Sequence, residues 1–174
     1  MPNFAIDRPG AALRPVTAHD QPFLLSLYAS TREAELRLTN WTDAEKQQFV
    51  RMQFEAQQRA YFGYADAEFF LILQDGTPAG RIYLQHRHDA ILVIDVSLLP
   101  AYCGQGIGGA VLSAVLRQAM GAGKRVQIHV ERFNPAQRLY QRLGFRLVED
   151  KGVYLFLEWS GTAEIGRASC RERG

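Results

Sequence analysis

The spacing of apolar residues divides the chain into parts with two different periods. In the first third, apolar residues recur every three or four positions, which is typical of amphipathic helices. This period predicts a helix that starts after Thr17 and frays near Ser30, after which residues 32–36 either continue it or start a second helical piece. It predicts a second helix up to about residue 60, opened by a capping box of Thr42 and Glu45. The predicted inner face of the second helix carries Phe49, Met52, Gln53 and Ala56.

The apolar residues of the rest of the chain mostly form alternating or continuous runs, which indicate strands. Seven segments read as strands, and proline places the first at a sheet edge: 13–16, 69–73, 80–85, 90–99, 124–130, 145–149 and 153–159. A helix from Ile107 to Gly121 or Gly123 joins the fourth and fifth strands, so these two should be parallel. A short helix capped by Asn134 and ending at Gly144 follows.

This order predicts one α/β domain of the α+β type over residues 11–160. We expect a mixed, mostly antiparallel sheet of about seven strands, with a central parallel pair and about four flanking helices. Residues 1–10 hold two prolines and a glycine and are predicted to be a mobile leader.

Composition narrows the class of protein. The chain has 174 residues, of which 47% are hydrophobic and 22% charged, so it is long enough to bury a core without disulfides. It has no run of eighteen apolar residues and no apolar signal core at its start. We therefore expect a cytoplasmic location and no membrane partner.

The last residues, 164–174, form a segment of a different kind. Their codons can be written as a widely used sequencing adapter read in frame, so we interpret the segment as a non-native read-through tail. The alternative is a genuine disordered tail. The tail carries Arg167, Arg171 and Arg173 against Glu164 and Glu172, so removing it lowers the net charge from +2 to +1. No basic excess then argues for a nucleic-acid partner, and one cysteine remains.

Between the strand at 90–99 and the next helix lies a loop with four glycines in six residues. Glycine lets a ligand approach the backbone closely, and a helix start presents free N–H groups with a positive dipole end. Together these features bind phosphate. The loop therefore predicts a site for a phosphorylated ligand at Gly104 to Gly109.

A dinucleotide site is one interpretation of this loop. Gly104 to Gly109 spells G-x-G-x-x-G, and Glu131 lies about twenty residues further on. Against this, Pro100 to Cys103 separate the strand from the first glycine, which should end the strand directly. A Walker loop fails because no Lys-Ser/Thr pair follows the glycines.

Two motifs in order resemble the GCN5-related N-acetyltransferase (GNAT) superfamily. Residues 98–108 are similar to its acetyl-CoA loop, which has Arg or Gln, two residues, Gly, one residue, and Gly or Ala. Residues 134–145 resemble its segment from Asn to Leu-Tyr-x-x-Leu-Gly-Phe. Cys103 departs from the family pattern because it stands at the Arg or Gln position, which puts the strength of donor binding in doubt.

The resemblance implies acetyl-CoA as cosubstrate, no metal, and acetyl transfer to a primary amine of a small molecule or peptide by direct attack. It implies that the loop amides hold the pyrophosphate and that the preceding strand splays from its neighbour to pair with the pantetheine arm. The implied donor-binding residues are Val96, Ser97, Leu98, Cys103, Gly104, Gln105, Gly106, Ile107, Gly108, Gly109 and Asn134.

By the same resemblance, Tyr140 is the acid that protonates the leaving thiolate. His129, Glu131 and Asp95 are candidate bases for the amine, and each has an ordinary structural alternative. Residues expected to line the acceptor pocket are Tyr28, Arg32, Glu35, Trp41 and Gln53. Family members are often dimers, so a homodimer is a possible partner state. A non-catalytic acyl-CoA-binding module is the main alternative function.

Overall fold

The computed structural model describes residues 5–161, so the predicted tail at 164–174 lies outside the described residues. The strands are β1 (Ala11–Pro15), β2 (Ala67–Gln74), β3 (Thr77–His86), β4 (Ala90–Leu98), β5 (Arg125–Glu131), β6 (Arg146–Asp150) and β7 (Tyr154–Trp159). The α-helices are α1 (Gln21–Arg37), α2 (Asp43–Phe62), α3 (Ile107–Ala122) and α4 (Gln137–Leu143). None of the helices among these residues is long and apolar enough to cross a membrane.

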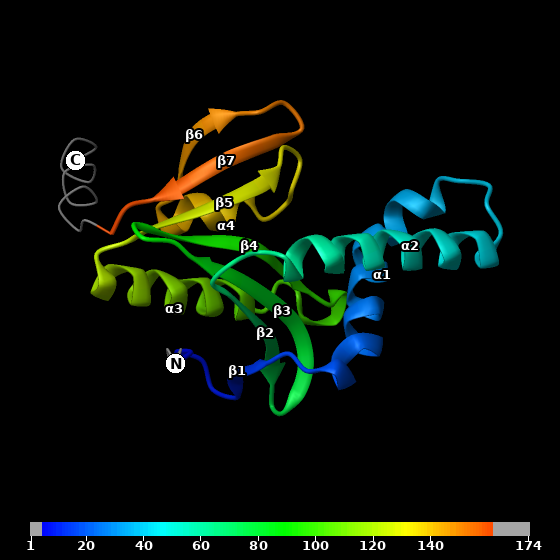
Figure 1. Cartoon of the computed structure of the whole chain (residues 1–174), viewed down its shortest axis with the longest axis horizontal. Coiled ribbons are helices and arrows are strands. Elements are labelled where there is room, and N and C mark those ends of the chain that lie inside the picture. The colour runs from blue at the N-terminus through cyan, green and yellow to red at the C-terminus, as the bar shows by residue number, and fades with distance from the viewer. Residues whose placement is uncertain (1–4, 162–174) are drawn as a thin grey trace.

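All seven strands join one mixed sheet in the order β1-β2-β3-β4-β5-β7-β6 (Figure 1). β4 and β5 are parallel, as the intervening helix predicts, and every other pair is antiparallel. The fold is therefore the predicted single-domain α+β fold. β1, which ends at Pro15, lies at one edge, where a missing N–H costs no ladder hydrogen bond.

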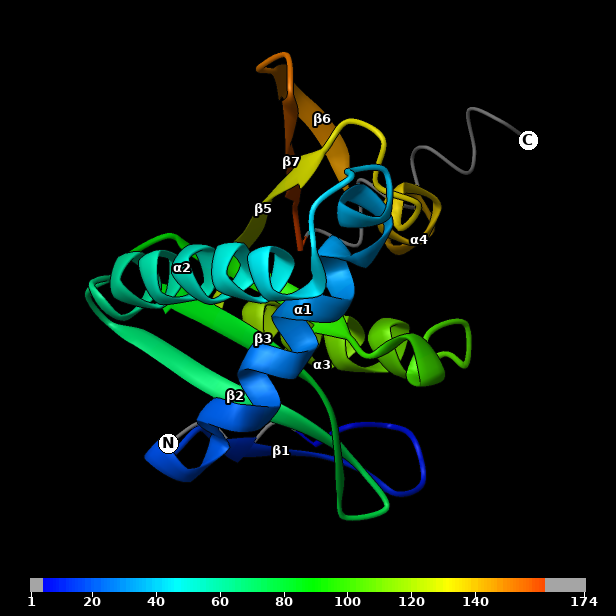
Figure 2. The ribbon, with the colours of Figure 1, turned by 90° about the vertical axis from the view of Figure 1, so that its right-hand side faces the viewer.

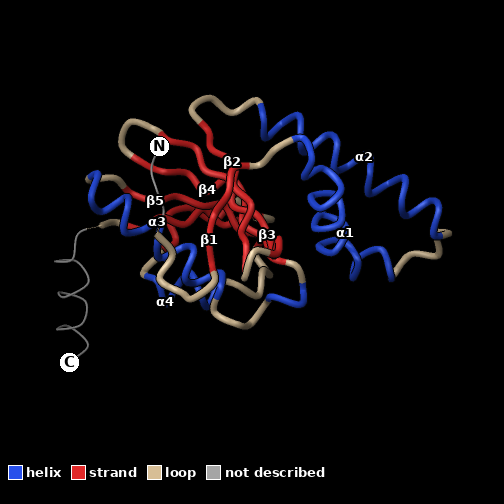
Figure 3. Tube along the Cα trace, turned by 90° about the horizontal axis from the view of Figure 1, so that it is seen from below, coloured by secondary structure: helices blue, strands red, loops and turns tan. Residues whose placement is uncertain are grey.

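Helices cover both faces of the sheet. The larger core cluster packs α3 and Tyr140 of α4 against one face, which includes Ile82 and Val93. The smaller cluster packs α1 and α2 against the other face through Leu71. Figures 2 and 3 show α1 and α2 on one side of the strands and α3 on the other.

The structure corrects three helix predictions. α1 does not fray near Ser30, because residues 32–36 continue the same helix to Arg37, one of the two alternatives that the sequence left open. The inner face of α2 carries Val50 and Phe54, whereas the predicted Met52 is 57% exposed. The predicted face was wrong because the inner stripe also includes a polar residue, Gln57, which contacts the buried sheet residue Arg81.

The third correction concerns the start of α4. Asn134 does not cap a helix whose first residue is Pro135, since α4 begins at Gln137 with Ala136 as its N-cap. The Asn134 side chain instead accepts the N–H of Ala136 at 2.8 Å, and its carbonyl accepts the N–H of Gln137 at 3.2 Å. This is an Asx turn, a local alternative to the helical bond that asparagine favours.

Asp20, at the start of α1, gives a first testable prediction. Its carboxylate accepts hydrogen bonds from Arg14 at 2.9 Å and from the Thr17 N–H at 2.7 Å. The Arg14 hydrogen bond is the main cause that lowers the pKa of Asp20 to about 2. We expect Asp20→Asn to lower the free energy of unfolding by about 1 kcal/mol at pH 7.

The pH dependence of that loss follows from the sign of the pKa shift. The folded pKa is below the unfolded value of about 3.9, so the stabilisation is complete above that value and is lost as the pH falls towards 2. Urea unfolding of wild type and variant at pH 7 and pH 3 measures this, with Asp7→Asn as a control. An equal difference at both pH values would contradict the assignment.

Candidate functional site

The glycine loop leaves the end of β4 and leads into α3. After Leu98, a short 3-10 turn (Pro100–Tyr102) precedes two glycines in left-handed backbone, Gly104 with φ 74° and Gly106 with φ 86°. Gly106 is the N-cap of α3, and no side chain caps this helix. The first N–H groups of α3 therefore lack intrahelical partners and lie beside backbone that favours glycine. This is the arrangement that binds phosphate.

Cys103 does not add a polar group to this loop. Its side chain is exposed, and the Sγ lies 3.5 Å from the carbonyl oxygen of Leu99 in the same loop. Gln105 also bonds within the loop, through Nε2 to the carbonyl oxygen of Ala101 at 2.6 Å. The loop therefore offers backbone N–H groups and helix dipole, without a cationic side chain of its own.

The parallel strands β4 and β5 separate beside the loop, as the family resemblance implies. They pair only from Ala90–Val93 with Arg125–Ile128. Beyond this, residues 95–98 of β4 pair only with β3, and residues 129–131 of β5 pair only with β7. A bulge at Ile94 marks the point of separation, because Tyr83 pairs with Asp95 while Leu84 pairs with Val93. We call this opening between residues 95–98 and 129–131 the strand split.

Tyr140 lies on α4 and is only 4% exposed. Its ring packs edge-on against Phe145, with 5.8 Å between centroids. Burial, followed by the charge of Asp95, raises the pKa of Tyr140 to about 12. The phenol therefore carries its proton at neutral pH, and the Asp95 carboxylate lies near enough for its charge to act on it. A protonated phenol is the form required of an acid.

Asp95 belongs to a buried polar cluster on the α2 side of the sheet. Arg81 of β3 is 2% exposed and donates from Nε to Asp95 at 2.6 Å and from Nη2 to Gln57 at 2.8 Å. The guanidinium lies over the rings of Tyr83 at 4.8 Å and Tyr61 at 5.6 Å. Asp95 also helps to raise the pKa of Tyr61, after burial. The charge of Asp95 thus acts on Tyr61 of α2 and on Tyr140 of α4, whose helices cover opposite faces of the sheet.

The other two candidate bases lie on β5. His129 is exposed, its ring lies 4.7 Å from that of Phe156, and its Nε2 is 3.2 Å from the Lys151 Nζ. Burial and then Lys151 lower the pKa of His129, so it is neutral at pH 7. Glu131 ends the strand and is also exposed. Among the described residues, no hydrogen bond or ion pair joins either side chain to Tyr140 or Asp95.

The residues predicted to line an acceptor pocket are spread over α1, the connection between α1 and α2, and α2. Tyr28 is buried and its hydroxyl accepts from Arg32 at 3.0 Å, while Arg32 also pairs with Glu35 at 3.1 Å. Trp41 packs edge-on against Phe49 at 5.2 Å. Gln53 is exposed. These contacts are mostly internal to the helices.

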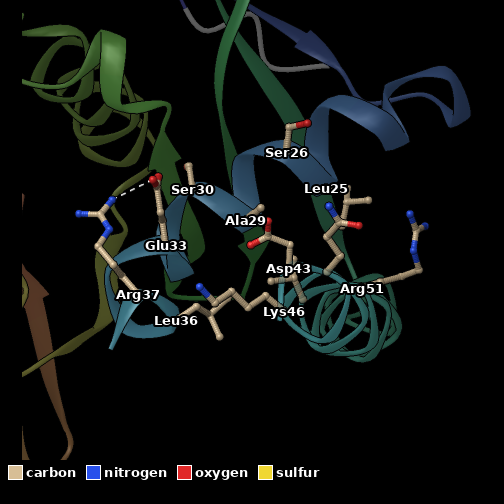
Figure 4. Close-up of a pocket in the computed structure, with 12 residues that line it drawn as sticks. Leu25, Ser26, Ala29, Ser30, Glu33, Leu36, Arg37, Asp43, Lys46 and Arg51 are labelled. Atoms are coloured by element: carbon tan, nitrogen blue, oxygen red, sulfur yellow. Dashed lines mark hydrogen bonds and ion pairs between the residues drawn. The ribbon is translucent and has the colours of Figure 1, made fainter. Parts of the chain in front are cut away.

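A cavity of about 710 Å³ lies between α1 and α2 (Figure 4). Its wall mixes apolar residues such as Leu25 and Val50 with charged ones such as Glu33, Lys46 and Arg51. None of the loop, strand-split or Tyr140 residues lines it. The cavity is therefore separate from the predicted chemistry. Among the described residues, no group of three His, Cys, Asp or Glu side chains is arranged to hold a metal ion.

Sequence reasoning missed Arg81, Gln57 and Tyr61 as members of a common site. Asp95 could be singled out from the sequence because a carboxylate is unusual in an apolar strand. Its partner Arg81 reads as an ordinary polar position of an alternating strand. Only the antiparallel register, which sets Arg81 opposite Ser97, places it beside Asp95.

The mixed sheet with its parallel β4–β5 pair, the strand split and the glycine loop point to the acyltransferase class. A family model described as Acetyltransferase (GNAT) family matches residues 34–145. The chain belongs to the GNAT acetyltransferase family. No curated protein sequence matches it at a significant level.

Solved structures share this fold at low sequence identity. The PaiA N-acetyltransferase of Thermoplasma acidophilum, in complex with coenzyme A, is 18% identical with a TM-score of 0.66, over 86% of this chain and 98% of that one. The ribosomal-protein-S18-alanine N-acetyltransferase of Escherichia coli is 16% identical with a TM-score of 0.60, over 87% and 94%. Arabidopsis thaliana Naa50, with the bisubstrate analogue CoA-Ac-MVNAL, is 17% identical with a TM-score of 0.58, over 87% and 99%.

Proposed function

We propose that this enzyme transfers an acetyl group from acetyl-CoA to a primary amine of a small molecule or peptide, by direct attack of the amine on the thioester. The observation that carries the proposal is the strand split, bounded by the phosphate-binding loop at one end and flanked by Tyr140. Binding of coenzyme A by structural neighbours supports the donor. The neighbours named for ribosomal proteins or an N-terminal peptide support including peptide amines among the acceptors.

In this proposal the free N–H groups from Gly104 to Gly109 hold the pyrophosphate. The β4 edge at Val96 to Leu98 bonds the pantetheine arm, and one of its N–H groups polarises the thioester carbonyl. Asn134, whose Asx turn fixes the approach to α4, lies in the motif that contacts the same arm. The backbone thus supplies most of the donor site.

The chemical step makes one bond and breaks one. The amine nitrogen attacks the thioester carbon, the C–S bond breaks, and the thiolate takes the Tyr140 proton, which is later replaced from solvent. The amine loses one proton to a base or to water. His129 is neutral at pH 7 and so can accept a proton, Glu131 is a second candidate, and the Asp95 carboxylate attracts the acceptor's ammonium group.

The test is acetyl-CoA-dependent release of CoA thiol in the presence of a panel of amines. The panel contains peptides with a free α-amino group, a lysine ε-amine and small polyamines. Amine-dependent release together with an acetylated product supports the proposal. Acetyl-CoA binding without release under any amine indicates a non-catalytic binding module. Thermal stabilisation by NAD(P) and none by acetyl-CoA would overturn it.

A further inference from the structure

We propose that Arg8 supplies the cation that the family's loop pattern places at position 103, and that it binds a phosphate of the donor. The inference rests on acetyl-CoA being the donor, as proposed above. Four observations support it. They concern the contacts that anchor residues 5–10, the position of the Arg8 guanidinium, its lack of a carboxylate partner, and the position of the Cys103 side chain.

The segment that carries Arg8 is fixed to the domain at several points. Ile6 packs against the larger core cluster, and Arg117 of α3 donates to the carbonyl oxygen of Ala5 at 3.0 Å. The N–H of Arg8 donates to Ile6 at 2.9 Å, and that of Asp75 donates to the carbonyl of Gly10 at 2.8 Å. Residues 5–10, predicted as a mobile leader, therefore run along α3 and the β2–β3 turn.

The half-buried Arg8 side chain reaches the phosphate-binding loop. Its Nη1 lies 3.2 Å from the point that a Cβ would occupy on Gly106, the N-cap of α3. Its Nε faces the Gln74 amide oxygen at 3.4 Å. A hydrogen at Gly106 leaves the guanidinium room to lie against the loop backbone. Two segments 98 positions apart in the chain thus meet at the helix start.

The charges at this point are unbalanced. Among the residues that the structure describes, no carboxylate lies within 4.0 Å of the Arg8 guanidinium. The guanidinium lies instead beside the positive end of the α3 dipole and its free N–H groups, where a cation is unfavourable. An anion bound beside the guanidinium and the helix start can interact with both, and a phosphate accepts from a guanidinium with two parallel hydrogen bonds.

Cys103 cannot supply a positive charge to the loop. A thiol 3.5 Å from its own loop's carbonyl carries no fixed positive charge and no fork of donors. Arg8 approaches the same loop from outside it. The chain thus keeps one arginine at the loop, supplied by the N-terminal segment in place of position 103.

Calorimetric titration with CoA tests the proposal. Arg8→Gln is expected to weaken CoA binding by about tenfold, as for loss of a charge-assisted hydrogen bond. Arg8→Lys keeps the charge but not the fork, so it should lose less. Arg51→Gln on α2, an exposed arginine away from the loop, is the matched control and should bind as wild type. Dephospho-CoA, which lacks the 3′-phosphate, shows which phosphate is involved. If wild type and Arg8→Gln bind dephospho-CoA with equal affinity, Arg8 binds the 3′-phosphate. If the difference in affinity remains, Arg8 binds the pyrophosphate.

Unfolding temperatures and a second substitution at Cys103 show whether Arg8 binds the ligand or only stabilises the fold. The unfolding temperature without CoA should be unchanged or higher in Arg8→Gln, whereas the increase caused by CoA should be smaller. Cys103→Arg should tighten CoA binding in Arg8→Gln more than in wild type, because the two arginines serve one phosphate. Equal CoA affinity of wild type and Arg8→Gln overturns the inference and leaves the donor assignment standing. Absence of CoA binding in wild type overturns the donor assignment itself.

Discussion

Replacing Tyr140 by phenylalanine is expected to lower kcat on the order of a hundredfold, since a positioned acid contributes about 10² to 10⁴. The variant removes one oxygen and keeps the ring, which packs against Phe145 in a buried position. The dissociation constant for acetyl-CoA should therefore stay within about twofold of the wild-type value. Rates of CoA thiol release and calorimetric titration measure the two quantities.

The pKa of Tyr140 sets the pH range of this effect. Because burial and Asp95 raise it to about 12, Tyr140 stays protonated through pH 7 to 10. Wild-type kcat should show no alkaline loss from this group in that range, and the ratio of wild type to Tyr140→Phe should stay constant. Tyr64→Phe, at an exposed tyrosine after α2, is the control. A Tyr140→Phe enzyme with wild-type kcat would remove Tyr140 from the mechanism.

The second large effect is expected at the Arg81–Asp95 ion pair. Asp95→Leu leaves a guanidinium that is 2% exposed without its anion, and breaking such a pair costs about 3–5 kcal/mol. The remaining partners of Arg81 are the Gln57 amide and two aromatic rings, and its Nη1 has no partner among the described residues. Urea unfolding should show a large decrease in midpoint at unchanged slope.

A double variant separates stability from function. Arg81→Met with Asp95→Leu removes both charges, so most of the lost free energy of unfolding should return. Acetyl transfer should stay low in the double variant, because it lacks the carboxylate that we propose attracts the acceptor's ammonium. Recovery of wild-type activity in the double variant would show that Asp95 serves the fold alone. A double variant as unstable as Asp95→Leu would show that the pair is not the source of the effect.

Elements governed by local patterns could be predicted from the sequence. The Asp75-Gly76 turn has positive φ at both residues, the conformation that this dipeptide favours in hairpins. The predicted helix from Ile107 forms as α3, and Gly123, one of the two predicted ends, caps it in left-handed backbone. The crossover from β4 to β5 is parallel for a topological reason that needs only the element order.

The missed features depend on contacts between distant segments. Arg81 meets Asp95 through strand register and Gln57 through helix packing, neither of which shows in local periodicity. Arg8 meets Gly106 across most of the chain, in a segment that its prolines mark only as irregular. The prediction of the start of α4 was wrong for a local reason, because the Asn134 side chain forms an Asx turn that competes with the helix.

The strand split also divides the sheet into two half-sheets, β1–β4 and β5–β7. β4 and β5 are joined by four residue pairs. In the described part of the chain, this is the strand pairing that connects β1–β4 to β5–β7. Each of the two half-sheets has its own edge at the split. A donor bound along the β4 edge, as proposed above, would lengthen the seam between the two half-sheets. Acetyl-CoA should therefore slow amide hydrogen exchange at 95–98 and make the two half-sheets open as one cooperative unit.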